Sequence, residues 1–515
     1  MTSLPLFAVL LPLACGSPPA DPGQIAARID ARIDERLAAD QVVAASDSED
    51  FEFYRRLSLD LTGRIPTADE TRAFLDDSSE DRRAAAIDRL LASPRHAAHF
   101  ANVWRSILLP EADADRQVRY LQPGFEAWLR DQRQARRSFD GIVRDLLTVP
   151  IVGPDQPPQL VLKDLQAANP IAFIASKEAD PGKLAAASTR VFLGLRMECA
   201  QCHDHPFDRW TREQFWNQAA FFSGLQRKGR GTFAPLIEDP AARSIPIMDV
   251  DAVAPALFLT GETPDAGSPA SGRTALADWI TRADNPWFAR AIVNRVWAQL
   301  MGVGLVDPVD DFQELNPPSH PELLDELAQA FASSGFDLDL LYRGICLSRA
   351  YQRTSRLTDP SQSEARLFAR ANLKAMSGDQ FADSLLLAAG VIEPDSAAPL
   401  TRSQDGTRRR LLDLVAAQGA DGEPQTSVAQ TLLLMNGRNL TGGRAPATTQ
   451  TPDGGEATAE EAIEQLYLRT LSRRPRADER TLIEDYLAAA PAEGEPPLAD
   501  ILWMLLNSAE FQWNH

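Results

Sequence analysis

The chain has 515 residues, with 52 Lys+Arg against 72 Asp+Glu, which gives a formal net charge of −20. This charge argues against a nucleic-acid-binding protein, because a phosphate backbone demands a basic face. A hydrophobic fraction of 44% with 24% charged residues is typical of a soluble globular protein, and the length suggests two or three domains.

The N-terminus carries an apolar run at residues 4–14, shorter than the roughly 18 residues of a membrane-spanning helix but typical of a signal peptide. Ala14-Cys15-Gly16 resembles a bacterial lipoprotein cleavage site, which would make Cys15 a lipid anchor. The alternative is plain secretion without a lipid. We therefore expect a signal peptide at 1–15 and a tether at 16–23. The mature protein would be exported to the periplasm or outer cell envelope, with membrane contact only through the lipid.

The next part of the chain, 24–223, has the periodicity of helices and predicts a first helical domain. Thr67 and Glu70 form a capping-box pair ahead of one of these helices. The other helices are expected at 24–39, 81–92, 125–137, 139–147 and 212–222.

Residues 224–270 are rich in Gly, Pro and Asp and predict a connecting segment with a few short strands. A second helical domain is expected over 271–515, so the fold class is mainly α. Its helices are predicted at 274–282, 287–301, 321–333, 340–351, 377–389, 428–436, 459–471, 477–489 and 498–507, with a surface loop at 442–458.

One motif carries a specific chemistry: Cys199-Ala200-Gln201-Cys202-His203 has the spacing of c-type haem attachment. Two thiols separated by two residues can add to the two vinyl groups of a haem, and the adjacent His203 can then ligate the iron. The sequence leaves the sixth iron position open. Candidate ligands are His96, His99, His320, Met301 and Met376, and an open face is the alternative.

Other chemistries for the motif remain open. Zinc is one alternative cofactor, with His205 completing a cluster, although a second pair of ligands at similar spacing is missing from the sequence. A disulfide between Cys199 and Cys202 without any cofactor is another. The fourth cysteine, Cys346, is expected to be a core thiol.

A second group of polar residues occupies the Pro-rich segment 302–322. Asp307, Asp310, Asp311 and His320 are candidates for binding a divalent cation or for acid–base catalysis on a glycan or ester. The structural alternative makes Ser319 a helix N-cap and pairs the aspartates with Arg290 and Arg295. The arginine clusters at 408–410 and 473–476 are predicted to be solvated faces.

Several long segments resemble a known bacterial family. Residues 53–67 and 199–216 resemble the planctomycete cytochrome-associated domain of unknown function, and residues 273–312, 316–328, 347–354 and 506–515 resemble its usual companion domain. The resemblance implies an exported helical protein of two paired domains. Such pairs often occur beside cytochrome c modules, and a role in extracellular glycan breakdown or electron transfer is supposed for them.

The sequence thus favours an exported redox or electron-transfer protein with one covalent haem c at Cys199, Cys202 and His203, working with envelope redox partners. The alternative is a hydrolase or glycan-processing accessory protein that uses the 307–320 loop, with the cysteines as a disulfide or metal site. A third possibility is a structural partner in an envelope complex. An empty pocket on the order of several hundred Å³ beside His203 would favour the haem hypothesis, which would fail if Cys199 and His203 pointed into packed core with no such pocket.

Overall fold

The structure is a computed structural model that describes residues 21–162, 164, 167–265, 270–392, 406–412, 458–489 and 497–515. The predicted signal peptide with Cys15, the predicted helix at 428–436 and nearly all of the predicted loop at 442–458 lie outside these residues. Within the described residues the fold is mainly α-helical, as predicted.

The first helix, α1 (Pro22–Ala39), begins two residues before its predicted start and shortens the predicted tether. Asp21 precedes it in an extended conformation, and Pro22 suits the first turn because its missing N–H has no helical partner there. Its buried stripe is Ile25, Ile29 and Ile33. The next helices are α2 (Asp50–Thr62), α3 (Ala68–Asp76), α4 (Arg82–Leu91), α5 (Pro94–Leu108), α6 (Arg116–Arg119), α7 (Gln122–Gln134) and α8 (Phe139–Leu147), with a 3₁₀ turn η1 (Pro110–Asp113).

Helix α2 is unusual because residues 52–61 are all buried, so it runs through the interior. The predicted capping box of α3 is confirmed: the Thr67 hydroxyl accepts from the Glu70 N–H, and the Glu70 carboxylate accepts from the Thr67 N–H. Helix α5, with Ser93 as its N-cap, lies in a stretch for which the periodicity predicted no helix.

The middle of the chain forms short elements. They are α9 (Ala172–Ser176), α10 (Pro181–Ser188), the π-helical turn η2 (Thr189–Leu193), the 3₁₀ turn η3 (Glu198–Gln201), α11 (Arg212–Ala219) and the 3₁₀ turn η4 (Ala220–Phe222). The short strands predicted for the connecting segment are confirmed as two antiparallel pairs. These are β1 (Leu225–Arg227) with β2 (Leu236–Glu238), and β3 (Ser244–Pro246) with β4 (Val253–Pro255).

The second half is helical again. Its elements are α12 (Gly272–Ile280), α13 (Phe288–Met301), α14 (Pro321–Ser333), α15 (Leu338–Leu347), α16 (Arg349–Gln352), the 3₁₀ turns η5 (Pro360–Ser363) and η6 (Ala365–Leu367), α17 (Gly378–Ala388), α20 (Ala459–Leu471), α21 (Ala477–Ala489), α22 (Pro497–Leu506) and α23 (Ala509–Gln512). The helix predicted at 340–351 is broken at Ser348, whose hydroxyl caps α16. Strand β5 (Lys374–Ala375) pairs with the C-terminal β6 (Trp513–Asn514), in the register Lys374 opposite Asn514.

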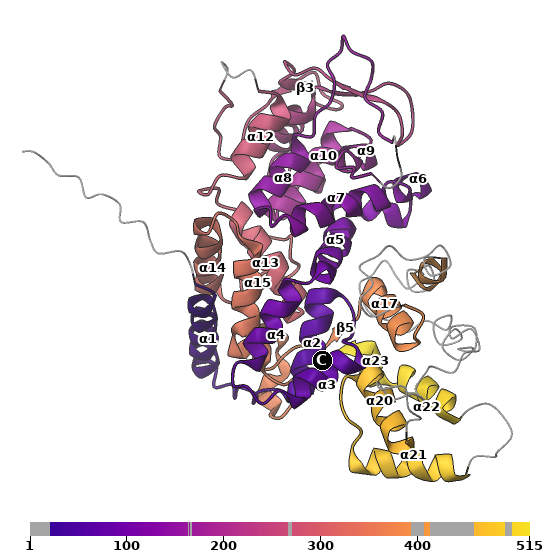
Figure 1. Cartoon of the computed structure of the whole chain (residues 1–515). Helices are drawn as coiled ribbons and strands as arrows, with labels where there is room; N and C mark the ends of the chain where they lie inside the picture. Colours follow the sequence, from indigo (N-terminus) through magenta and orange to yellow (C-terminus); the bar gives the residue numbers. More distant parts are fainter. Residues whose placement is uncertain are drawn as a thin grey trace, which may run out of the picture.

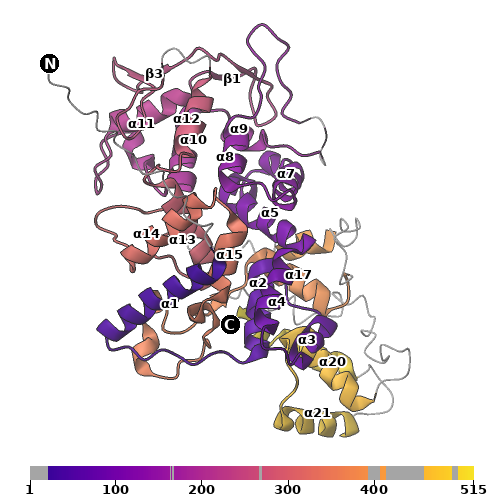
Figure 2. The same ribbon diagram turned by 60° about the vertical axis from the view of Figure 1, so that its left-hand side comes forward.

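Two hydrophobic cores hold these elements together. The larger core contains side chains from α1 at Ile25 through to Ala369, so helices on both sides of the 224–270 segment share it. The smaller core joins α17 and α20–α23, with Leu59 and Ile65 of the N-terminal half packed into it. Figures 1 and 2 show this second group at one end of the molecule, with α10, α12 and β3 at the other end. Within the described residues, no helix is long and apolar enough to cross a bilayer.

Two arginines predicted to lie on solvated faces do not. Arg408 bonds to the carboxylates of Asp379 and Asp383 with its side chain mostly covered. Arg473 is buried between Glu479 and Glu510. Each of these two covered guanidiniums is compensated by two carboxylates, which offsets the cost of removing its charge from water.

Candidate functional site

The Cys-x-x-Cys-His motif follows directly from the end of a helix. The chain passes from α10 through the π-helical turn and leaves it at Gly194, which has φ +71° and acts as a left-handed cap. It then forms the 3₁₀ turn Glu198–Gln201, which contains Cys199. Met197 and Ala200 are fully buried, so two apolar side chains fix this turn to the core.

Both thiols of the motif are available. Cys199 and Cys202 are exposed and unpaired, so the disulfide alternative is not formed in this structure. Cys346, in contrast, is buried, which agrees with the predicted core thiol. Burial raises the pKa of the Cys346 thiol well above its ordinary value and keeps it unreactive.

His203 is exposed and is oriented by its own backbone. Its Nδ1 lies 2.8 Å from the carbonyl oxygen of Asp204, and only a protonated Nδ1 can donate to that oxygen. The neutral imidazole therefore keeps its lone pair on Nε2. A histidine that ligates a metal through Nε2 characteristically donates its other N–H to a carbonyl or carboxylate, so this donor arrangement fits an iron ligand.

The loop after the motif is closed by internal hydrogen bonds. The His205 N–H donates to the Trp210 carbonyl (2.8 Å), and His205 Nδ1 accepts from the Phe207 N–H (3.3 Å). The Asp204 carboxylate accepts from the Arg212 N–H at the start of α11 (2.8 Å). The lone pair of His205 Nδ1 is thus already used within the loop. Across the described parts of the chain, no three His, Cys, Asp or Glu side chains group in a metal-binding arrangement.

The aspartates of the 307–320 loop are engaged in local structure. Asp310 pairs with Arg196 (2.7 Å) and more loosely with Arg295 (3.8 Å). The predicted Arg295 pair is thus confirmed, whereas Arg290 pairs with Asp325 instead (2.7 Å). The amide groups of Gln313 (2.9 Å) and Asn316 (3.4 Å) donate to the Asp311 carboxylate, and the exposed Asp307 accepts through its backbone carbonyl from Asn316 (3.2 Å).

His320 lies apart from these aspartates. It is buried against Phe368, and burial lowers its pKa to about 4. The N-cap position of α14 belongs to His320, not to Ser319 as predicted, and neither side chain caps the helix. Instead the Ser319 hydroxyl bonds to His320 Nδ1 (3.0 Å). The His320 ring contacts Phe368 and Ser319, and none of the three aspartates is among its ring or hydrogen-bond partners. Catalysis by this loop therefore stays a prediction.

The other candidate iron ligands contact other parts of the fold. His96 Nδ1 bonds to the Leu61 carbonyl (2.7 Å), and the His99 ring packs on Gly63 at the end of α2. Burial lowers their pKa values to about 3 and about 4. Met301 is buried at the end of α13, and Met376 packs against the smaller core. None of these contacts involves residues 197–210.

Sequence reasoning missed the residues that dock the motif. The Phe312 N–H donates to the Gly194 carbonyl (3.0 Å), and the Arg196 guanidinium holds Asp310. These contacts join the segment before the motif to the loop predicted to be catalytic. A glycine and an arginine shortly before Cys199 gave no local sign of this, because their partners lie more than 110 residues away in the sequence.

The comparisons with known families match both halves of the chain. Residues 28–227 match the PSCyt2 family, described as a protein of unknown function (DUF1549), and residues 272–418 match PSD1, described as a protein of unknown function (DUF1553). The chain carries these two family domains one after the other, in the order of the planctomycete cytochrome-associated arrangement. Its PSCyt2 domain carries the Cys-x-x-Cys-His motif, and its PSD1 domain carries the 307–320 loop. The Arg196–Asp310 pair therefore links the PSCyt2 and PSD1 domains. No match was found among curated proteins or among solved structures.

Proposed function

We propose that this PSCyt2–PSD1 protein carries one covalent haem c on Cys199, Cys202 and His203 and serves in redox or electron transfer outside the cytoplasmic membrane. The observation that carries the proposal is the presentation of two free, exposed thiols and an exposed histidine from one short turn. A packed core at this point would have excluded a haem. Cys199, Cys202 and His203 are all exposed, so no packed core covers them.

Each residue of the turn has a chemical part in this proposal. The Sγ–H of Cys199 and that of Cys202 each add across a vinyl C=C, so that a thioether and a C–H bond form and nothing leaves. His203 offers the lone pair of Nε2, because its Nδ1–H is held by the Asp204 carbonyl. When bound, the haem supplies one-electron chemistry at its iron.

The surrounding protein holds the turn in place. Met197 and Ala200 are buried beneath it, and Trp216 on α11 donates its indole N–H to the Gln201 carbonyl (3.1 Å). Arg196 joins it to Asp310 of the companion domain. A rigid turn favours attachment, because the two sulfurs then need little reordering to meet the two vinyl groups.

The test is expression of the full chain together with a bacterial haem-maturation system, followed by a pyridine haemochrome spectrum of the purified protein. We expect the spectrum of a haem bound through thioether bonds. Cys199→Ala with Cys202→Ala should abolish it, whereas Cys346→Ala, a substitution of the buried thiol, should retain it. A wild-type protein without haem, or a band that survives the double substitution, would overturn the proposal.

Export and lipid anchoring form the second part of the proposal and rest on residues 1–16. We infer that Cys15 is lipidated and that the folded body reaches its envelope redox partners from the membrane surface. Cell fractionation tests this inference. The wild type should sediment with membranes and Cys15→Ser should be released in soluble form outside the cytoplasm. Equal distribution of the two proteins would contradict lipidation.

A further inference from the structure

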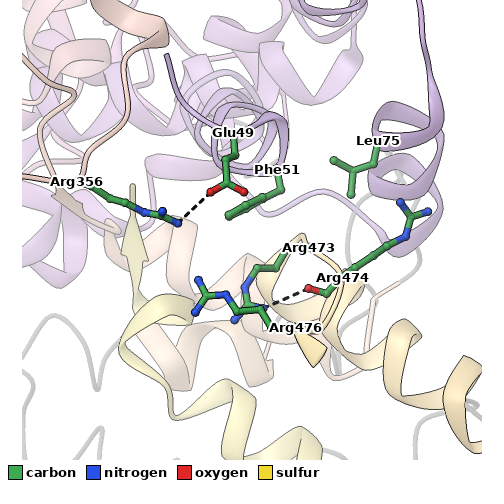
Figure 3. A pocket seen from close by; sticks show the side chains of 7 residues that line it. All are labelled: Glu49, Phe51, Leu75, Arg356, Arg473, Arg474 and Arg476. Carbon is green, nitrogen blue, oxygen red and sulfur yellow. Dashed lines mark hydrogen bonds and ion pairs between the residues drawn. The ribbon is translucent and has the colours of Figure 1, made fainter. Parts of the chain in front are cut away.

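A cavity of about 600 Å³ opens far from the motif, where α2 and α3 meet the connection between α20 and α21. Figure 3 shows its walls. Glu49 and Phe51, at the start of α2, lie on one side and Arg473 and Arg476 on the other. The remaining lining residues are Leu75, Arg356 and Arg474. In Figure 1 this region lies at the end of the molecule opposite α10, α12 and β3.

Two of the four arginines are fixed parts of the wall. Arg473 bonds to Glu479 (2.7 Å) and Glu510 (2.6 Å), and also donates to the Arg474 carbonyl (3.2 Å). Burial alone would lower the pKa of Arg473, but these carboxylates outweigh it and raise the pKa. Arg474 pairs with Asp76 (2.7 Å) and Glu464 (3.1 Å). Both guanidiniums are thus compensated by the protein itself.

The guanidinium groups of the other two arginines are available to a ligand. The Arg476 backbone N–H donates to the Glu479 carboxylate (2.7 Å), while the Arg476 guanidinium has no hydrogen bond or ion pair with any residue that the structure describes. Among the residues that the structure describes, the Arg356 guanidinium pairs only with Glu49, at 3.3 Å, and both of these side chains are more than half exposed. An exposed pair of this kind contributes little and exchanges readily with another carboxylate.

The cavity also has an apolar side. Phe51 and Leu75 are half-buried and line it between the charged residues (Figure 3). Cavities of 300–1,000 Å³ with apolar walls and a few placed polar groups are the usual sites of small organic ligands. Guanidinium groups suit planar or tetrahedral oxyanions, because they donate two parallel N–H bonds.

We propose that this cavity binds a small organic anion, in which a carboxylate or sulfate ester lies on Arg476 and Arg356 and the apolar part contacts Phe51 and Leu75. Glu49 acts as the internal competitor, because it holds Arg356 until the ligand replaces it. Because the whole chain has a net charge of −20, only the arginines of the cavity would attract an anion. Salt screens such exposed charges, so binding should weaken as the ionic strength rises.

The experiment is isothermal titration calorimetry of the full-length protein with phenylacetate and with phenyl sulfate, at low and high salt. We expect saturable binding of at least one of the two, weakened by salt, and no binding of the uncharged analogue phenylacetamide. Which of the two binds more tightly distinguishes a carboxylate site from a sulfate site. Arg476→Gln should weaken binding roughly tenfold or more, and Glu49→Gln should strengthen it.

A matched control is Arg480→Gln. Arg480 lies in the first turn of α21, four residues after Arg476. It pairs with Glu460 and does not line the cavity, so its loss should leave binding unchanged. Melting curves of all three variants show that each is folded. The proposal is overturned if neither anion binds, if phenylacetamide binds as well as phenylacetate, or if Arg476→Gln and Arg480→Gln behave alike.

Discussion

Arg196 and Asp310 form an ion pair between the two family domains, with the Arg196 Nε 2.8 Å and its Nη2 2.7 Å from the same Asp310 oxygen. Arg196 stands three residues before Cys199, and Asp310 belongs to the loop that the sequence offered as a rival catalytic site. The two groups of residues are therefore one structural unit, in which the acidic loop positions the cysteine-bearing turn.

Loss of this pair should loosen the turn. Asp310→Asn removes the charge that faces Arg196 and Arg295, and we expect a cost of about 1 kcal/mol, because the Arg196 side is half exposed. Amide hydrogen exchange of residues 194–203 should become faster than in the wild type. Asp307→Asn, at an exposed carboxylate of the same loop, is the control and should leave exchange unchanged. Equal exchange in all three proteins would refute the positioning role of Asp310.

The close packing at Gly194 gives a second test. Gly194 and Gly335 have nearly the same φ, +71° and +72°. A Cβ on Gly194 would come 2.5 Å from the Phe312 ring, whereas one on Gly335 would meet nothing within 4 Å. Alanine at either position should destabilise the protein by about 1–2 kcal/mol, because its backbone would be strained at a positive φ. Gly194→Ala should lose about 1–3 kcal/mol more in denaturant unfolding, because Phe312 must move. Equal losses would show that the contact with Phe312 is not tight.

Substitution of Asp60, on the buried helix α2, should have the largest effect on stability of the changes considered. Its carboxylate accepts from Lys374 Nζ (2.5 Å), Asn514 Nδ2 (2.7 Å) and the Tyr351 hydroxyl (2.8 Å), and so joins α2 to strands β5 and β6. Asp60→Asn would leave the Lys374 ammonium buried without its counter-charge, at a cost of about 3–5 kcal/mol in unfolding free energy.

A surface aspartate provides the comparison for Asp60. Asp88 pairs with Arg343 (2.5 Å), and the Asp88 side chain is half exposed. Asp88→Asn should therefore cost less than about 1 kcal/mol in the same chemical denaturation experiment. If the two variants lost similar stability, Asp60 would not be compensating the buried Lys374 ammonium.

Buried His96 should make the protein less stable in mild acid. Burial lowers its folded-state pKa to about 3, while the unfolded chain takes up a proton near the ordinary value of 6.5. Stability is therefore full above about pH 6.5 and is lost as the pH falls toward 3, by as much as about 2 kcal/mol between pH 7 and 5. His96→Gln should flatten this part of the stability–pH curve. An unchanged slope in the variant would show that His96 does not titrate on unfolding.

Local signals predicted much of the fold. The capping box at Thr67, the helices near 459–471 and 477–489 and the strands of the connecting segment follow from periodicity, caps and turn residues within a few positions. The cysteine–histidine motif is likewise local, because its spacing alone carries the chemistry. The exposure of the motif could not be predicted from its spacing, because it depends on the fold. The buried Met197 and Ala200 hold the turn against the core and leave Cys199 at the surface.

What the sequence could not predict depends on distant partners. The basic cluster of Arg473, Arg474 and Arg476 predicts a solvent-exposed Arg473, yet its guanidinium is buried against Glu510 of the C-terminal helix. Helix α2 contains the buried charged residues Arg55, Arg56 and Asp60. Their partners are distant in the sequence, at Arg353, Lys374, Phe511 and Asn514. Contacts between residues several hundred positions apart cannot be predicted from the pattern of a dozen neighbouring residues.

The intact mass of the purified protein tests the central claim most directly. After expression of the full chain with a haem-maturation system, we expect a mass increase of one haem under denaturing conditions, carried by the peptide that contains Cys199 and Cys202. Cys199→Ala with Cys202→Ala should have the mass of the bare chain. A wild-type chain without added mass, or a haem released by denaturation, would contradict covalent attachment at this motif.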